Sequence, residues 1–501
     1  MLLSHAQRGR GLYAPARNTS EPMEIKRFYL SCLAHASYLI HDGGEAAVID
    51  PQRDVSLYLE EASELGVRLR WVIETHLHAD FVSGHLELAA RSGATICIGA
   101  GSGALFPHLS LNDGDELRLG AATLRALATP GHTEESICVL AFEGRDSQAP
   151  LAVFSGDTLF IGDVGRPDLS PTRTPQELAA LLYDSLHQKL LTLPDETLVY
   201  PAHGAGSLCG RQMSSDSSST IGKERRFNYA LQPATREQFV SLLTAEMPPR
   251  PEYFQNEVAQ NRAGAASLEE LPPVRALHPD DAVALQSSGA VILDTRPPEK
   301  FGASHLPGSI NIALSGQFAS WVARLLGTET SLVLVAEDDA AQQEARIRLA
   351  RVGVEKVAGA LAGGILAWVD SGKTTHSIDQ ISALDAAEWL ESNPATTTLL
   401  DVREPAERAS GAFIPGSISI PLPDLQKRLD ELDRDKTIIV HCQGGYRSAI
   451  ASSILDSAGF PRISNLVGGY GAWKLSCNAE PHPAPIAVEA THLRILESEI
   501  R

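Results

Sequence analysis

The sequence of 501 residues lacks long apolar runs, paired cysteines and an excess of basic charge. No apolar stretch approaches the ~18 residues that a membrane-spanning helix needs, so no membrane partner is expected. The six cysteines are scattered without a C-x-x-C pair, which argues against a disulfide framework and favours a reducing, cytoplasmic location. With 42 basic and 62 acidic residues the formal net charge is −20, which argues against binding to nucleic acid.

The chain is too long for one hydrophobic core and predicts two to four domains. Its 43% hydrophobic and 21% charged residues are ordinary for a globular protein, so each domain can bury a core. The first 22 residues contain Arg8, Arg10 and Arg17 but no apolar core of a secretory signal. We expect residues 1–22 to be a disordered extension, with an organelle-targeting segment as the alternative.

Short apolar runs alternate with helical patterns from residue 23 to about residue 245, which is typical of an α/β fold. Runs that end in polar residues predict strands that bring those residues to one edge of a sheet. The predicted strands are Glu45–Asp50, Arg70–Glu74, Thr95–Ile98, Ile137–Phe142, Leu151–Phe154 and Thr197–Tyr200, and the predicted helices include Leu57–Leu65 and Gly84–Arg91.

The sequence beyond a predicted linker at residues 261–274 repeats itself. Three motifs recur in the same order: a D-x-R after an apolar run, a P-G-S-I, and a G-G-x-x-A-W. The corresponding residues are Asp294 and Asp401, Pro307 and Pro415, and Trp368 and Trp473, which lie 107, 108 and 105 residues apart. The chain therefore predicts one large domain, residues 23–260, and two small related domains, residues 275–375 and 380–480, with a tail at 481–501.

Four predicted loops of the large domain carry residue types that bind metals. His76, His78 and Asp80 form an H-x-H-x-D cluster directly after a predicted strand. Later loops read P-G-H-T, S-G-D-T and P-A-H-G and contribute His132, Asp157 and His203. An isolated histidine is more often structural than a ligand, but this ordered series predicts a metal centre.

This pattern resembles the metallo-β-lactamase superfamily over residues 25–245, which implies an αββα sandwich with the ligand loops along one sheet edge. Two-metal members such as glyoxalase II have a histidine where this sequence has Phe81. A phenyl ring cannot bind a metal, so the second site would keep only Asp80 and His203 as strong ligands. We expect weak occupancy there.

The large domain is most similar to the persulfide dioxygenases, a one-iron branch of that superfamily. Their ligands correspond to His76, His132 and Asp157, a facial triad that would hold one Fe(II) and leave three positions open. The resemblance implies that His78, Asp80 and His203 orient these ligands or bind substrate, although maintenance of the fold is an equal alternative for His78 and Asp80.

Further matches to the same family are Gly165–Asp168, Ala202–Gly210 and Lys223–Leu231. They imply that Arg166 and Tyr200 contact the thiol carrier of the substrate. A guanidinium suits this role because it pairs bidentately with carboxylate or phosphate, while a purely structural arginine is the alternative.

The remaining cysteines of this domain fall into two classes. Cys97 and Cys138 lie in apolar runs and are expected to be inert core residues. Cys209 lies in a glycine-rich loop where an accessible thiol is expected, and Cys32 lies near the start of the fold. Because cysteines occur at similar places in rhodanese-fused dioxygenases, the resemblance suggests a sulfur relay through Cys32 and Cys209.

The two repeats resemble rhodanese domains, and they differ at the active loop. The second repeat reads Ile438–Ala449, an apolar strand followed by Cys442, two glycines and a helical pattern with Arg447. Loop N–H groups and the helix N-terminus favour a reactive, persulfide-carrying thiolate at Cys442, and Arg447 could bind sulfite or thiosulfate. The first repeat has Glu337 at the aligned position, which predicts an inactive domain kept as a scaffold or docking surface.

The combined resemblances imply a non-haem iron enzyme that oxidises a thiol persulfide to sulfite and serves sulfide detoxification. The expected partners are O₂, sulfite, thiosulfate and the persulfide of glutathione, coenzyme A or a similar thiol, and a homo-oligomer is expected. Cys442 would exchange sulfur between persulfide and thiosulfate in a direction that the sequence does not set. The alternatives are a glyoxalase-II-like zinc thioesterase with accessory rhodanese domains, and a sulfur carrier or regulatory binder whose metal site is vestigial.

Overall fold

The computed structural model describes residues 22–477, apart from 145–146, 234, 246, 248 and 410. The extension at 1–21 and the tail beyond 480 therefore lie outside the described residues. Two compact units form, the first from residues up to Pro297 together with Ile312–Lys373, and the second from Pro298–Asn311 together with residues from Thr374 on.

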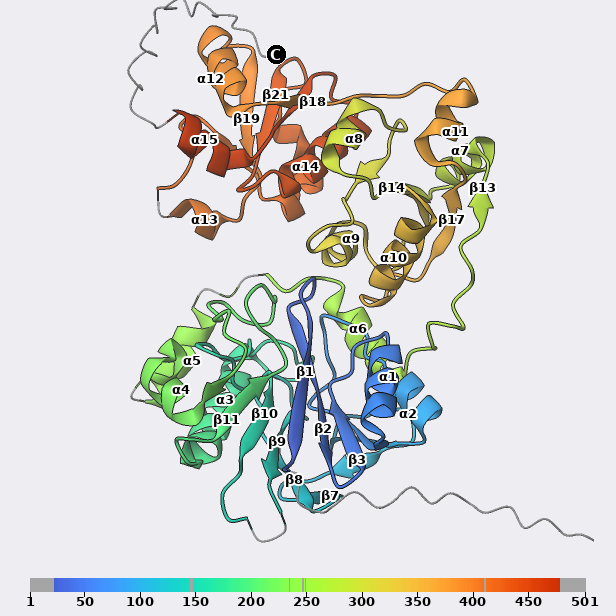
Figure 1. Ribbon diagram of the computed structural model, residues 1–501. Coiled ribbons are helices and arrows are strands. Elements are labelled where there is room, and N and C mark those ends of the chain that lie inside the picture. Colours follow the sequence, from blue (N-terminus) through green and yellow to red (C-terminus); the bar gives the residue numbers. More distant parts are fainter. Residues whose placement is uncertain are drawn as a thin grey trace, which may run out of the picture. The chain divides into compact units, whose positions relative to one another are not determined.

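Two six-stranded sheets form the centre of the first unit (Figure 1). In spatial order the first sheet contains β1 (Glu24–Leu30), β2 (His35–Asp42), β3 (Glu45–Ile49), β4 (Arg68–Glu74), β5 (Thr95–Gly99) and β6 (Leu109–Leu111). The second contains β12 (Ser219–Thr220), β11 (Leu198–Pro201), β10 (Ala152–Gly156), β9 (Ile137–Phe142), β8 (Ala122–Ala128) and β7 (Glu116–Leu119). The pairs β3–β4, β4–β5, β5–β6 and β10–β11 are parallel. The other pairs in the two sheets are antiparallel.

Helices cover the outer faces of both sheets, which confirms the predicted αββα sandwich. They are α1 (Ser56–Leu65), α2 (His85–Ser92), α3 (Pro175–Gln188), α4 (Ile221–Phe227), α5 (Arg236–Thr244) and α6 (Phe254–Ala263), with short 3₁₀ turns η1 (Leu190–Thr192) and η2 (Tyr229–Leu231). One apolar cluster fills the space between the sheets, a second lies under α1 and α2, and a third lies under α3 and α5. All six residues of β9 are buried, which explains its unbroken apolar sequence.

The first repeat contributes parallel strands and four helices to the same unit. The strands in spatial order are β13 (Ala276–Leu277), β17 (Val357–Leu361), β16 (Leu332–Val335) and β14 (Val291–Asp294). The helices are α7 (Pro279–Ser287), α9 (Phe318–Leu326), α10 (Asp339–Ala350) and α11 (Gly364–Asp370). The predicted linker at 261–274 is wrong at its start, because helix α6 continues to Ala263 and buries Asn261.

The second unit has the corresponding order of parallel strands, as expected for a repeat. These are β18 (Asp379–Ile381), β22 (Ile463–Leu466), β21 (Thr437–His441), β19 (Thr397–Asp401) and β20 (Ile418–Ser419). Its other elements are α8 (Pro298–Ala303), β15 (Ile310–Asn311), α12 (Ala383–Ser392), α13 (Pro405–Ala409), η3 (Leu422–Lys427), η4 (Leu429–Glu431), α14 (Tyr446–Ser457) and α15 (Gly469–Cys477).

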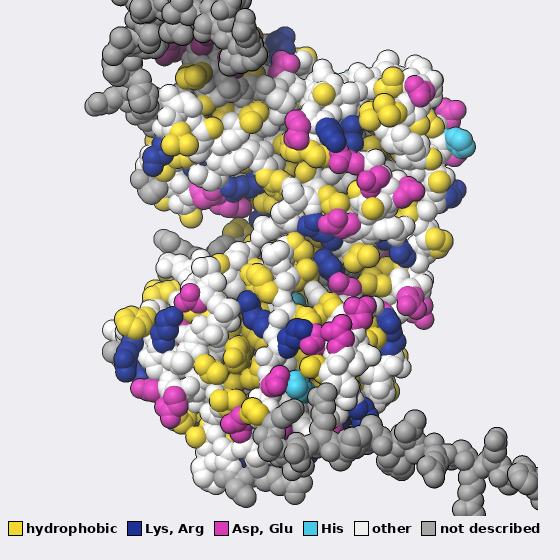
Figure 2. Space-filling model, viewed as in Figure 1, with side chains coloured by type: hydrophobic (Ala, Val, Ile, Leu, Met, Phe, Trp, Pro, Cys, Tyr) yellow, Lys and Arg dark blue, Asp and Glu magenta, His cyan; other side chains and the backbone are white. Residues whose placement is uncertain are grey.

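The face of the molecule seen in Figure 2 carries charge of both signs. Figure 2 shows Lys and Arg side chains interspersed with Asp and Glu on the visible face. Among the described residues, no helix combines the length and apolar character needed to cross a membrane.

Close packing of the loop that carries His132 against α3 gives a stability prediction. Gly131 has a φ of +149°, and a Cβ built there would lie 2.4 Å from the Cα of the buried Leu182. We expect Gly131→Ala to destabilise the fold by about 2 to 4 kcal/mol, because overpacking and backbone strain add. Gly93→Ala is the control, since Gly93 has a φ of +74° with open space around it and should cost only about 1 kcal/mol. Equal shifts of the two variants in urea unfolding would contradict this account.

Candidate functional site

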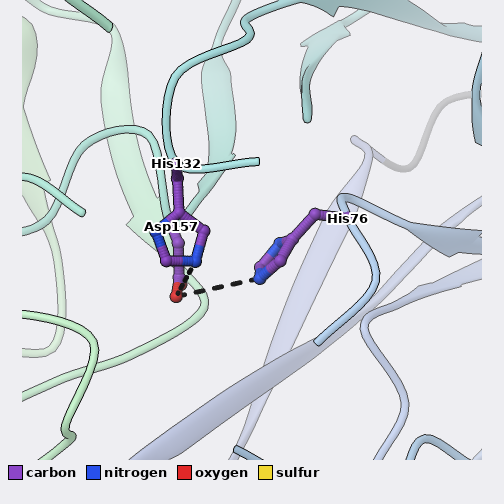
Figure 3. Close-up of side chains that lie close together, drawn as sticks. All are labelled: His76, His132 and Asp157. Carbon is purple, nitrogen blue, oxygen red and sulfur yellow. Dashed lines mark ion pairs between the residues drawn. The ribbon is translucent and has the colours of Figure 1, made fainter. Parts of the chain in front are cut away.

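Three loops bring His76, His132 and Asp157 together at one edge of the two sheets (Figure 3). His76 follows β4, His132 follows β8 and Asp157 follows β10. The Nε2 atoms of His132 and His76 lie 3.3 and 3.8 Å from the Oδ2 atom of Asp157, and all three side chains are buried. In Figure 3 both imidazole rings point toward the same carboxylate oxygen.

Hydrogen bonds on the far side of each ring set the histidine tautomers. The Nδ1 atom of His132 lies 2.9 Å from the carbonyl oxygen of Arg166, which can only accept, so Nδ1 carries the proton. The hydroxyl of Thr75 donates to Asp50 and therefore accepts from the Nδ1–H of His76 at 3.0 Å. Both Nε2 atoms are left with free lone pairs that face Asp157.

The arrangement fits a divalent metal. Within the described residues, neither His132 Nε2 nor Asp157 Oδ2 makes a hydrogen bond, although both are buried. Two buried acceptors that face each other at 3.3 Å are costly unless a cation lies between them. Burial also lowers the pKa of His76 and His132, which keeps both rings neutral as metal ligands must be.

His203 lies between two carboxylates rather than beside the three ligands alone. Its Nδ1 is 2.7 Å from Asp157 Oδ1, and its Nε2 is 2.9 Å from Asp80 Oδ2. Burial opposes a charged ring, but Asp157 and Asp80 outweigh it and raise the pKa of His203 well above the usual value. The protonated ring occupies one oxygen of Asp157 and leaves the other, Oδ2, directed at His76 and His132.

His78 contacts a different pair of acids. Its Nε2 lies 3.1 Å from Asp50 Oδ1 and 3.5 Å from Glu74 Oε2, so the ring does not join the Asp157 group. Burial lowers the pKa of His78, but the nearby Asp50 carboxylate raises it by more, so the pKa of His78 is above the usual value. Because Asp50 also holds Thr75, these contacts favour the fold-maintenance alternative for His78.

Phe81 fills the position beside these histidines with an apolar ring. Its centroid lies 4.4 Å from that of His78 and 4.0 Å from that of His35, and Phe81 is 1% exposed. His35 is a site residue that the sequence argument missed, because a lone histidine in an apolar run carries no motif. Burial, followed by the neighbouring His203 and His78, holds the pKa of His35 well below the usual value.

Cys209 corrects two expectations. Its sulfur lies with the ligand atoms of Asp80 and His203 in one group whose members are all within 4.8 Å, so three potential ligands meet where two were expected. Cys209 is also only 1% exposed, so the expected accessibility of its thiol is wrong. Burial and the charges of Asp80 and Asp157 raise its pKa well above the usual value.

The other sulfur and carrier-binding candidates lie at separate places. Cys32 is partly exposed, with its sulfur 3.9 Å from Arg351 Nη1. The Arg166 guanidinium pairs bidentately with Asp168 at 2.7 and 2.8 Å, and its Nη1 donates to the carbonyl of Leu208. Tyr200 is half-buried and stacks on Phe154 with a centroid distance of 5.5 Å. The roles of these residues stay predictions.

Helix α6 supplies two buried polar residues that the sequence argument missed. The side-chain amide of Asn261 donates to the carbonyls of His78 and Phe81, both at 2.8 Å, and thereby fixes the H-x-H-x-D loop. The carboxyl of Glu257 is buried without a hydrogen-bond partner among the described residues. Burial, helped by Asp80, raises the pKa of Glu257 to about 9, so its carboxyl is neutral at pH 7.

Cys442 of the second repeat lies in a cradle between β21 and α14. The backbone N–H of Gly445 donates to its sulfur at 3.1 Å, and the thiol lies beside the N-terminus of the helix. Gly445 has a φ of +102°, a conformation that glycine adopts without strain. This geometry stabilises negative charge on sulfur.

Arg447, which was expected to bind sulfite or thiosulfate, is paired with a carboxylate in the structure. Its guanidinium forms a bidentate ion pair with Glu407 of α13 at 2.6 and 2.7 Å. The buried Arg403 pairs with Asp401 and reaches Gln443 of the loop at 3.3 Å, a contact that its D-x-R motif did not reveal. A sulfur anion would have to compete with Glu407 for Arg447.

The first repeat has no cradle of this kind. Residues 336–338 connect β16 to α10, whereas residues 442–445 connect β21 to α14 in the second repeat. Asp338 caps α10 by accepting from the N–H of Ala341 at 2.8 Å. The strand registers pair Val335 with Asp294 and His441 with Asp401, so Ala336, and not the predicted Glu337, takes the place of Cys442. The first repeat therefore presents a methyl group where the second repeat presents a thiol.

Comparison with known families agrees with both resemblances. Residues 30–203 match the model of the Metallo-beta-lactamase superfamily, and residues 278–371 and 382–476 match that of the Rhodanese-like domain.

The relatives include two kinds of enzyme. "Persulfide dioxygenase ETHE1, mitochondrial" of Homo sapiens is 33% identical over 248 residues, which covers 48% of this chain and 88% of the relative. A hydroxyacylglutathione hydrolase of Acidiphilium cryptum is 33% identical over 243 residues, with coverage of 48% and 90%. The solved metallo-beta-lactamase of Staphylococcus aureus subsp. aureus COL has a TM-score of 0.61 at 30% identity and covers 68% of this chain and 99% of its own.

The neutral carboxyl of Glu257 predicts a pH-dependent stability. Between about pH 4.5 and pH 9 the unfolded chain ionises this group and the folded chain does not, so its contribution to stability falls as pH rises. We expect Glu257→Gln to gain stability relative to the wild type from pH 6 to pH 8.5, measured by urea unfolding. The exposed Glu329→Gln serves as the control. A constant difference between wild type and Glu257→Gln across this range would show that Glu257 is ionised in the folded protein.

Proposed function

Because the chain belongs to the metallo-beta-lactamase superfamily and carries two rhodanese-like domains, we propose that it is a persulfide dioxygenase coupled to a sulfurtransferase. The observation that carries the proposal is the pair of neutral histidines facing an unpartnered carboxylate oxygen, with Phe81 beside them. Two imidazoles and one carboxylate suit a single Fe(II) with open coordination positions.

The proposed oxidation takes R–S–SH, O₂ and water to R–SH, sulfite and two protons. An iron bound by His76, His132 and Asp157 would supply the O₂ chemistry. The protein's own contribution is to keep both histidines neutral and to keep Asp157 ionised, with one oxygen on protonated His203. Phe81 and the buried surroundings exclude water from the side of the site that faces His35.

The proposed sulfur transfer uses Cys442. A Cys442 persulfide gives its outer sulfur to sulfite, so that thiosulfate leaves and the thiolate remains, and the reverse transfer uses the same groups. The Gly445 N–H and the α14 N-terminus would stabilise the thiolate in either direction. Cys32 and Cys209 are proposed as relay positions, with Cys209 requiring local opening because it is buried.

A two-zinc thioester hydrolase is the second candidate. The hydroxyacylglutathione hydrolase relatives and the Asp80, His203 and Cys209 group favour it. Against it, Phe81 stands where the two-metal members of the superfamily have a histidine, and its ring packs against His35 and His78.

The cellular setting is also a proposal. The five cysteines for which side chains are described are all free, which supports a reducing compartment such as the cytoplasm. A homo-oligomer is proposed without a defined interface.

Metal content and O₂ uptake test the oxidation. We expect one iron per chain, and O₂ uptake with sulfite formation from glutathione or coenzyme A persulfide. Asp157→Asn should weaken metal binding by at least about 100-fold, because a ligand is lost, whereas the exposed Asp113→Asn should bind normally. Two zinc ions per chain with thioester hydrolysis and no O₂ uptake would establish the hydrolase instead.

Cys442→Ser separates the two chemistries. We expect this variant to consume O₂ and release sulfite at the wild-type rate while thiosulfate formation falls to background. Cys97→Ser is the matched control, because burial raises the Cys97 pKa to about 12 and leaves an inert thiol. If Cys442→Ser still forms thiosulfate, a residue other than Cys442 carries the transferred sulfur.

A further inference from the structure

A pocket in the first unit lies between the metal-binding domain and the first repeat. Asp80, Leu208 and Tyr253 line it from the metal-binding domain. Gln317, Trp321 and Arg324, which lie at the start and along helix α9, line it from the repeat. An element of the inactive rhodanese-like repeat thus forms one wall of a pocket beside the candidate metal centre.

The pocket borders the metal ligands through Asp80. Asp80 Oδ2 lies 2.9 Å from His203, and His203 lies 2.7 Å from Asp157, so two contacts lead from the pocket to the metal ligand set. The second oxygen of Asp80 is buried and makes no hydrogen bond among the described residues. A group that enters between α9 and Leu208 therefore approaches the centre from its Asp80 and Cys209 side.

Polar contacts join the first repeat, to which α9 belongs, to the metal-binding domain. Arg351 pairs bidentately with Asp54 at 2.8 Å, and Arg53, which is 1% exposed, pairs with Glu355 at 2.8 Å. Nearer the pocket, the Gln317 amide donates to the carbonyl of Gly206 at 2.9 Å. Buried and bidentate pairs of this kind fix orientation, so α9 is a preorganised part of the pocket.

The wall presents a cation and an aromatic ring. The Arg324 guanidinium lies 4.7 Å from the centre of the Trp321 ring, which orients it, and Arg324 is the cation among the described residues that line this pocket. Arginine forms strong, directional hydrogen bonds with carboxylate and phosphate, whereas an uncharged tail would gain little from it.

We propose that the first rhodanese-like repeat is a substrate-binding element of the dioxygenase site. Arg324 binds the carboxylate or phosphate on the tail of the thiol carrier, Trp321 packs against the tail, and the sulfur end extends past Asp80 toward the metal. This inference rests on the proposed function, because it takes the substrate to be a thiol persulfide. It explains why a repeat without a thiol keeps close, buried contacts with the metal-binding domain.

Binding of unreactive carriers tests the proposal without turnover. The probes are S-methylglutathione, whose anionic groups are carboxylates, S-methyl-coenzyme A, whose anionic groups are phosphates, and the uncharged 2-(methylthio)ethanol. Isothermal titration of the full chain should give a Kd that rises about 10- to 100-fold in Arg324→Ala for an anionic probe, the usual loss for a charged hydrogen bond. The uncharged probe should bind all variants alike, and the probe with the larger loss identifies the carrier class.

Two further variants control the result. Arg324→Lys keeps the charge and should recover part of the affinity, which also covers the case in which the alanine variant unfolds. Arg346→Ala removes an arginine of the same repeat whose guanidinium donates to the carbonyl of Leu271 outside the pocket, and it should bind like the wild type. In persulfide turnover, Arg324→Ala should raise KM and leave kcat unchanged.

The outcomes separate this inference from the proposed function. Wild-type affinity of Arg324→Ala for both anionic probes, or equal losses in Arg346→Ala and Arg324→Ala, would overturn the role of Arg324. A wild-type protein that binds an anionic probe through Arg324 but consumes no O₂ with any persulfide would refute the dioxygenase and leave the binding site standing.

Discussion

The first unit depends on one electrostatic constraint, which is that His132 Nε2 and Asp157 Oδ2 face each other as buried acceptors. Such a pair is unfavourable by several kcal/mol without a cation, so the geometry of these loops suits a bound cation. The surrounding hydrogen bonds serve that geometry. The Arg166 carbonyl fixes the tautomer of His132, Asp50 and Thr75 fix that of His76, and protonated His203 takes the other oxygen of Asp157.

The same constraint explains the chemical asymmetry of the site. On one side, the rings of His76, His132 and His203 converge on Asp157. On the other side, Phe81 packs between His35 and His78 and supplies no metal ligand. The number of metal ions held here is the physical difference between the proposed oxygenase and a two-metal hydrolase.

The two repeats show how one fold can serve different purposes. The second repeat has a loop of four residues, 442–445, in which the Gly445 N–H donates to the Cys442 sulfur, and Glu407 pairs with Arg447 of the following helix. The first repeat has a loop of three residues that ends in a capping aspartate, and its α9 faces the metal-binding domain instead. Loss of the thiol in the first repeat is therefore compatible with a binding role, because the chemistry is supplied by another domain.

Much of this protein is determined by its sequence. Unbroken apolar runs predicted the strands, because a strand buried on both faces, such as β9, has no polar positions. The H-x-H-x-D cluster and the three later loops predicted which residues meet, because parallel strands deliver their ends to one sheet edge. The recurring motifs predicted two repeats and the absence of a thiol from the first, although Ala336 rather than the predicted Glu337 takes the place of Cys442.

Only the tertiary structure decided the contacts that join distant segments. Asn261 was expected in a linker, yet it lies in α6 and holds the His78 loop from more than 180 positions away in the chain. The burial of Cys209, the neutral state of Glu257 and the presence of Arg324 at the pocket depend on which helices cover the site. Local sequence records periodicity and ligand types, whereas burial, pKa and pocket walls arise from segments that meet only when the chain folds.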